Sequence, residues 1–239
     1  MNFSHVYRSC IRKSLDEDRA EIAAAFQDII KRRVRVNLRL VNYHKGLPIS
    51  YPATLVDADR GLLELDLHQQ QAVVLNATRY TFIKCDYFHC AILAEVQSVN
   101  LRQMAASLRN FAFVEIMAEQ RNTLRLELEP QTDAEIRGTD LLMPGKVLDL
   151  SLEGVSLLPG GHCELKKGAE VTLRVMVPNL LHNTLTPLET KATHVVTTGP
   201  RGSQICRFSF SVEPQSQGMI SRYIFQRQVE IIRELKEQK

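Results

Sequence analysis

Two short clusters of polar residues lie far apart in the sequence but have complementary chemistry. The first, Arg121-Asn-Thr-Leu-Arg125, has two arginines four positions apart, and the second, Asp149-Leu-Ser-Leu-Glu-Gly154, has a carboxylate, a hydroxyl and a glycine. Residues i and i+4 fall on the same side of a helix and of a strand, so the two arginines form one cationic pair. An arginine fork binds phosphate oxygens, pairs with O6 and N7 of guanine, and stacks on purine rings. An aspartate accepts from the N1–H and N2–H2 groups of guanine, so the combined set suits a guanine nucleotide.

Both clusters fall on segments that read as strands. Residues 124–129 alternate leucine with charged residues, which predicts a half-buried strand with Arg125 on its solvent face. Residues 146–152 repeat the alternation, so Asp149 and Ser151 share a face opposite three leucines, and Gly154 permits a tight turn. We therefore expect two guanidinium groups, a carboxylate and a hydroxyl to converge outside a β core.

The order RxxxR followed by DxSxxG resembles the signature of PilZ domains, bacterial receptors for cyclic di-GMP. The resemblance covers roughly the C-terminal half of the chain. It implies that Arg121 and Arg125 hold the phosphates and one base, while Asp149, Ser151 and Gly154 grip the other side of a guanine. Many members have a further arginine directly before the first motif arginine. Gln120 stands there in this chain, which leaves open whether one ligand or a stacked pair binds.

Composition sets the broad class of the protein. The 239 residues, 44% of them hydrophobic, are enough for two modest domains, and the net charge of +3 requires neither a nucleic acid nor an anionic membrane as partner. Five cysteines without a CxxC spacing, and an N-terminus without an apolar signal core, predict a reducing cytoplasm. The apolar runs are far shorter than the roughly 18 residues of a membrane span, so we expect no direct membrane insertion.

The N-terminal half reads as a helix followed by closely spaced strands. We expect residues 1–13 to be loosely held, and Ser14 with Glu17 to open a helix by a capping box. The run Lys31-Arg-Arg-Val-Arg35 complements the dipole at the helix end, with a patch for an anionic partner as the alternative. The strands expected after the helix are 34–40, 53–56, 62–67, 72–75, and a hairpin of 78–84 with 91–99.

The C-terminal half continues the same pattern after Gly154. Strands are expected at 171–177, 190–197 and 206–212, and a helix follows Pro214 with Ile220, Ile224, Ile231 and Leu235 on one side and Phe225, Val229 and Ile232 beside them. The predicted fold class is mainly β, with two small antiparallel β-barrels, an N-terminal helix and a C-terminal helix. The predicted domains are a helical segment 1–33, a barrel 34–117 and a PilZ domain 118–239. The first barrel resembles the N-terminal lobe of the flagellar-brake (YcgR-like) group.

Other classes of function fit the sequence less well. No HExxH, GxSxG or paired-carboxylate motif is present, so we expect no enzyme, and we expect no cofactor. Cys85, His89 and Cys90 lack a fourth ligand at matched spacing, which disfavours a zinc site. A nucleic-acid-binding barrel would use stacking aromatics, which are 6% here without a tryptophan. A PilZ-like interaction module without ligand is the remaining alternative, and the intact motif residues count against it.

The expected function is therefore that of a non-catalytic receptor for cyclic di-GMP that signals to a protein partner. By resemblance the partner is the flagellar motor, with polysaccharide export, pilus or other secretion machinery as alternatives. A domain boundary near residues 117–120 puts Arg121 at the seam between domains. A ligand bound there would favour the interdomain arrangement that it contacts better.

Overall fold

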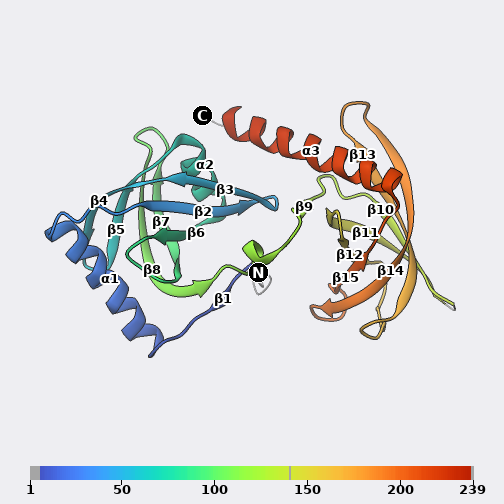
Figure 1. The fold of residues 1–239 in the computed structure, drawn as a ribbon, viewed down its shortest axis with the longest axis horizontal. Helices are drawn as coiled ribbons and strands as arrows, with labels where there is room; N and C mark the ends of the chain where they lie inside the picture. Colours follow the sequence, from blue (N-terminus) through green and yellow to red (C-terminus); the bar gives the residue numbers. More distant parts are fainter. Residues whose placement is uncertain (1–5, 140, 238–239) are drawn as a thin grey trace. The chain divides into compact units, whose positions relative to one another are not determined.

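The computed structural model describes residues 6–139 and 141–237, which divide into two compact units (Figure 1). The first unit consists mainly of Pro48–Arg121 and of the chain before Lys45. The second consists mainly of Asn122–Ile232 with Lys45–Leu47. The domain limits 1–33, 34–117 and 118–239 stay a prediction, because a grouping by contacts is not a test of independent folding.

One curled sheet forms the body of the first unit, in the order β3-β2-β6-β7-β8-β5-β4, with β1 paired to β8 (Figure 1). The expected β-rich lobe is confirmed as a half-barrel, since its terminal strands β3 and β4 do not pair with each other within the described residues. The strands are β1 (Arg8–Ser9), β2 (Leu38–His44), β3 (Leu47–Pro52), β4 (Thr54–Asp59), β5 (Leu62–Asp66), β6 (Tyr80–Cys85), β7 (Ala91–Asn100) and β8 (Ala105–Glu115).

Helix α1 (Leu15–Lys31) closes the core of this half-barrel. Its residues Ile22, Phe26 and Ile29 are at most 3% exposed and pack with buried residues of the sheet. These side chains recur at helical spacing, so a single face of α1 meets the sheet as the sequence predicts.

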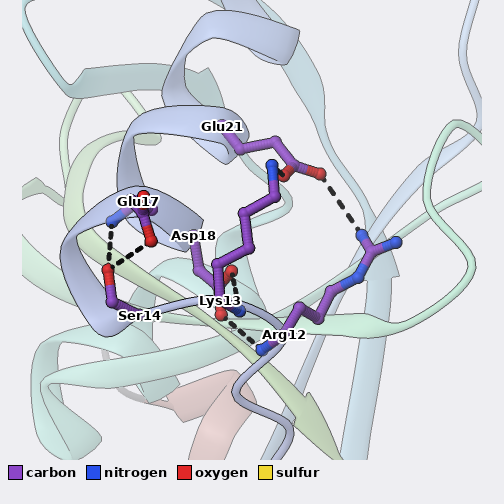
Figure 2. A network of polar contacts seen from close by, with 6 residues as sticks. All are labelled: Arg12, Lys13, Ser14, Glu17, Asp18 and Glu21. Atoms are coloured by element: carbon purple, nitrogen blue, oxygen red, sulfur yellow. Dashed lines mark hydrogen bonds and ion pairs between the residues drawn. The ribbon is translucent and has the colours of Figure 1, made fainter.

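The start of α1 confirms Ser14 as the predicted cap, but within the described residues the Glu17 carboxylate binds the Ser14 hydroxyl and not the Ser14 N–H of a full capping box (Figure 2). Ser14 is the N-cap: its Oγ accepts from the Glu17 N–H at 3.2 Å and donates to the Glu17 carboxylate at 2.8 Å. Asp18 is 2% exposed and accepts from the N–H groups of Arg12 at 2.8 Å and Lys13 at 3.2 Å. These bonds fix the preceding chain against the first turn of the helix.

The expectation that residues 1–13 are loosely held is wrong for residues 6–13, and residues 1–5 lie outside the described part. Arg8 and Ser9 pair with β8, and the Cys10 N–H donates to the Phe113 carbonyl at 2.8 Å. Val6 is 7% exposed in a second apolar cluster. Short-range patterns do not reveal such pairing, because the partner strand lies about a hundred residues away.

The strand expected at 72–75 is instead part of helix α2 (Gln69–Thr78). His68 caps its start, and Arg79 ends it in the left-handed conformation with φ 64°. Ala72 to Leu75 are all buried, and so is Gln71, which donates to Asn42 Oδ1 at 2.7 Å. A short apolar run that is buried on every side has no periodicity by which helix and strand could be distinguished.

In the second unit six strands close into a barrel, in the order β10-β13-β14-β15-β12-β11, with β11 paired back to β10. The neighbouring strands are antiparallel, so the predicted C-terminal barrel is confirmed. A 3-10 helix η1 (Met117–Gln120) precedes it in the chain. The strands are β9 (Leu126–Glu127), paired to β11, and β10 (Asp133–Arg137), β11 (Leu142–Ser151), β12 (Gly154–Pro159), β13 (Glu170–Asn179), β14 (Thr184–Thr198) and β15 (Ile205–Phe210).

Helix α3 (Pro214–Glu237) follows the last strand, as predicted. Ile220, Ile224, Ile231 and Leu235 are buried, whereas the neighbouring Phe225, Val229 and Ile232 are exposed. No helix within the described residues combines the length and apolar character needed to cross a bilayer.

The buried carboxylate of Asp18 provides a test of the fold. Replacing Asp18 by Ala should cost about 1.5–3 kcal/mol, because two backbone N–H groups lose a charged acceptor. Asp16→Ala is the control: the Asp16 side chain is 92% exposed, so its removal should lower the free energy of unfolding by less than about 1 kcal/mol. Urea unfolding measures both values, and hydrogen exchange should accelerate at Arg12 and Lys13. Equal losses in the two variants would contradict the role of Asp18.

Candidate functional site

Four of the five motif residues lie in or directly before strands of the second unit. Arg125 directly precedes β9, Asp149 and Ser151 lie at the C-terminal end of β11, and Gly154 begins β12. In the sheet Asp149 is opposite Glu127 of β9 on one side and Ser156 of β12 on the other. The spacing DxSxxG thus brings the aspartate beside β12, because Ser151 pairs with Gly154 across a two-residue turn, and the pairing with β9 places Glu127 on its other side.

The Arg125 and Asp149 side chains form an ion pair. Arg125 Nε lies 3.5 Å from Asp149 Oδ1, and the side chains are 26% and 23% exposed. Both atoms are buried, and neither has a hydrogen-bond partner within the described residues. Arg125 was expected on a solvent face. It is instead about three-quarters covered and paired with the carboxylate of the other motif, so the predicted convergence is found for Arg125 and Asp149.

The alternation expected around Asp149 is interrupted. A register shift lies between Val147 and Asp149 in the pairing of β11 with β12. As a result Val147 and Leu150 are each 1% exposed, whereas Leu148 is only half-buried. An extra residue in one strand moves the following side chains to the other face, which an alternating pattern does not predict.

Ser151 and Gly154 fix the hairpin that carries Asp149. Ser151 Oγ donates to the Gly154 carbonyl at 3.0 Å, which leaves the hydroxyl oxygen able to accept from a ligand N–H. Gly154 was expected to permit a tight turn. Its structural role is different: a Cβ there would lie 2.5 Å from the carbonyl oxygen of Phe208 in β15. Only glycine lets β12 approach β15 so closely at this point.

Arg121 lies in the first unit, directly after η1, with an extended backbone at φ −78° and ψ 134°. The pKa of Tyr43 is raised to about 12, chiefly by burial; the charge of Glu119 contributes to the rise, and the charge of Arg121 opposes it. Gln120 donates to Glu115 Oε1 at 2.6 Å. The joint action of Arg121 and Arg125 on one ligand stays a prediction.

The comparison with known families covers both motifs. Residues 119–226 match the family model described as PilZ domain. This part of the chain is a PilZ domain. No curated protein matches the sequence.

Solved structures resemble the fold at low sequence identity. YcgR of Escherichia coli in complex with c-di-GMP is 14% identical over 100% of both chains, with a TM-score of 0.46. The Bacillus subtilis inhibitor of motility MotI/DgrA is 11% identical over 81% of this chain and 96% of its own, with a TM-score of 0.44. The K. pneumonia MrkH–c-di-GMP complex is 14% identical over 90% of this chain and 96% of its own, with a TM-score of 0.45.

Two polar residues of the PilZ domain that the motifs do not include lie beside Asp149. Ser156 of β12 is opposite Asp149, and Arg207 of β15 is opposite Ser156. Ser156 is 1% exposed, and its Oγ has no hydrogen-bond partner within the described residues. Burial lowers the pKa of Arg207; the charge of Asp149 opposes this and that of Arg125 adds to it. The alternation of 206–212 indicates an outward Arg207, but only strand pairing brings it to the motif.

Helix α3 supports β9 from within the same unit. Arg227 is 2% exposed, and its Nε donates to the Glu127 carbonyl at 3.4 Å, as does the Tyr223 hydroxyl at 3.4 Å. The Arg227 guanidinium also pairs with Glu129 at 3.1 Å and with Glu230. Burial raises the pKa of Glu127, with Asp149 and Glu129 adding to the effect and Arg227 and Lys45 opposing it. The backbone beside the ion pair is thus held by α3 as well as by β11.

Among the described residues no cluster of three or more His, Cys, Asp or Glu could hold a metal ion.

The close approach at Gly154 provides a second test. Gly154→Ala should destabilise the PilZ domain by about 1–3 kcal/mol, because the backbone of β12 or β15 must shift to admit the Cβ. Gly161→Ala is the matched control, since a Cβ there meets nothing within 4 Å. Urea unfolding measures both, and a Gly154 variant as stable as the Gly161 variant would contradict the steric role.

Proposed function

We propose that this protein is a receptor for cyclic di-GMP that binds at Arg121, Arg125, Asp149, Ser151 and Gly154 and acts without catalysis. The observation that carries the proposal is the set of unsatisfied polar atoms. Arg125 Nε, Asp149 Oδ1 and Ser156 Oγ are all buried and without hydrogen-bond partners in the described residues, and they come from the residue before β9 and from the neighbouring strands β11 and β12. Buried polar atoms are nearly always bonded, so three of them close together in the sheet, beside the motif residues, support a ligand site.

The chemistry of these groups suits a guanine nucleotide. The carboxylate of Asp149 accepts from the N1–H and N2–H2 donors of guanine, and the Ser151 hydroxyl oxygen can accept one further bond. An arginine that leaves its ion pair with Asp149 presents its fork to a phosphate or to O6 and N7. YcgR and MrkH are described as complexes with c-di-GMP, which is the ligand that the motif resemblance implies.

Titration calorimetry with cyclic di-GMP tests the receptor function. Replacing Arg125 by Ala should weaken binding by about 1.5–3 kcal/mol for each charged hydrogen bond lost. Arg174→Ala removes the same charge from an exposed position on β13 and should leave the affinity unchanged. The stoichiometry also shows whether one ligand or two bind. If the wild-type protein, confirmed as folded, binds no ligand by calorimetry and by a second method, the ligand-free interaction module replaces the receptor.

We also propose that the bound ligand changes the arrangement of the two domains and thereby regulates a protein partner. The flagellar motor or other motility or secretion machinery is the class of partner that the motif resemblance favours. The proposal is motivated by the position of the two motif arginines, of which Arg121 is grouped with the first unit and Arg125 with the second.

Small-angle X-ray scattering of the full chain tests this change. The profile should differ between ligand-free protein and protein saturated with cyclic di-GMP, because the ligand favours the arrangement that it contacts better. The Arg125→Ala variant under the same conditions should keep the ligand-free profile. Superimposable profiles of the wild-type protein at proven saturation would contradict the proposal.

A further inference from the structure

A row of polar side chains crosses the PilZ domain next to the motif aspartate. Asp149, Ser156 and Arg207 are direct cross-strand neighbours on β11, β12 and β15. Side chains directly opposite each other in an antiparallel sheet share a face. The residues paired beside them, Leu150, Val155 and Phe208, are at most 2% exposed, so the barrel core takes the other face. The polar row therefore lies on the outside of the barrel.

The two ends of this row have complementary charges. Neighbouring strands lie about 4.8 Å apart, so the backbones at Asp149 and Arg207 are separated by roughly 10 Å. Arg207 lies within electrostatic range of both Asp149 and Arg125. No hydrogen bond or ion pair joins its guanidinium to another of the described residues. The five donors of this side chain are consequently available to a ligand.

The buried hydroxyl of Ser156 lies between these two groups in the sheet. It is 1% exposed and its Oγ is unpaired within the described residues, although most hydroxyl groups at such burial are bonded. An acceptor atom over the middle of the row would satisfy it. The outer face of the barrel thus offers a carboxylate acceptor, a hydroxyl and a guanidinium donor in this order.

A guanine base presents the matching order along its edge. Its N2–H2 and N1–H donors are followed by the O6 acceptor and then by the N7 acceptor. Asp149 suits the donors, and an arginine fork binds O6 and N7 together. Adenine has an amino donor in place of O6, which an arginine does not accept.

We propose that Arg207 is a specificity residue of the site, which binds O6 and N7 of the guanine whose N1–H and N2–H2 groups are bound by Asp149. Ser156 donates to the same O6 atom. The inference rests on the proposed binding of cyclic di-GMP, and it assigns the recognition of one base to a residue outside both sequence motifs. When the ligand binds, the guanine base replaces Arg125 as the partner of the Asp149 carboxylate.

A cycle of two proteins and two ligands tests this role. The ligands are cyclic di-GMP and its analogue with both guanines replaced by 7-deazaguanine, which lacks the N7 acceptor. The variant is Arg207→Met, which keeps the apolar stem and removes every donor. Arg174→Met is the matched control on an exposed position of a neighbouring part of the same barrel.

Arg207→Met should weaken binding of cyclic di-GMP by about tenfold or more and weaken binding of the 7-deaza analogue clearly less, because with the analogue only the O6 contact is left to lose. Any N7 contact made by Arg125 or Arg121 to the other base affects both proteins alike and cancels in the cycle. An equal loss for both ligands would show that Arg207 only supports the fold of the site, and equal affinities of variant and wild type would show no role. Either result overturns the inference while the receptor function stands.

Two further outcomes concern the binding of the wild-type protein and the folding of the variant. If wild-type protein binds neither ligand, the proposed receptor function fails before the role of Arg207 is reached. If Arg207→Met lowers the melting temperature so far that it does not fold, Arg207→Lys replaces it in the same cycle. Lysine keeps the charge but lacks the planar fork, so the difference between the two ligands should shrink. An undiminished difference in the lysine variant would overturn the inference.

Discussion

The contact between Arg125 and Asp149 joins two segments that are distant in the sequence. At 3.5 Å, with both side chains about three-quarters covered, the two charges attract each other but are not hydrogen-bonded. Desolvation opposes the attraction in such a pair, and good geometry with further hydrogen bonds is needed to offset it. The pair therefore holds the site together in the absence of ligand without satisfying its own atoms. A ligand that supplies the missing bonds exchanges a poor interaction for several good ones.

The closed barrel makes this arrangement possible. Because β11 pairs with β9, β10 and β12, the aspartate has a neighbour on each side, and the position of each neighbour is fixed by the register. Gly154 contributes by letting β12 approach β15, which brings Arg207 next to Ser156. The polar row is consequently a property of strand pairing, and Asp149 is the one residue of the row that belongs to the motif DxSxxG.

The extent to which the sequence predicts the structure depends on the range of the interactions. The cap at Ser14, the face of α1 and the alternating strands after Gly154 follow from residues near each other in the chain, and all are found. The helix at Gln69–Thr78 was missed because its apolar residues are buried on every side, supported by the bond from Gln71 to Asn42. The approach of the two motifs follows from their chemistry and from the family resemblance. Ser156 and Arg207 could not be assigned to the site, because nothing local specifies which strands become neighbours.

The strand β9 is only two residues long, and two of its fixed points are the bonds from Tyr223 and Arg227 of α3 to the Glu127 carbonyl. A strand with so few ladder bonds has a low free energy of local opening, which α3 raises. The stability of a helix far along the chain thus contributes to the stability of the strand beside Asp149. Substitutions in α3 can therefore loosen or tighten the backbone next to the two motifs while every motif residue stays the same.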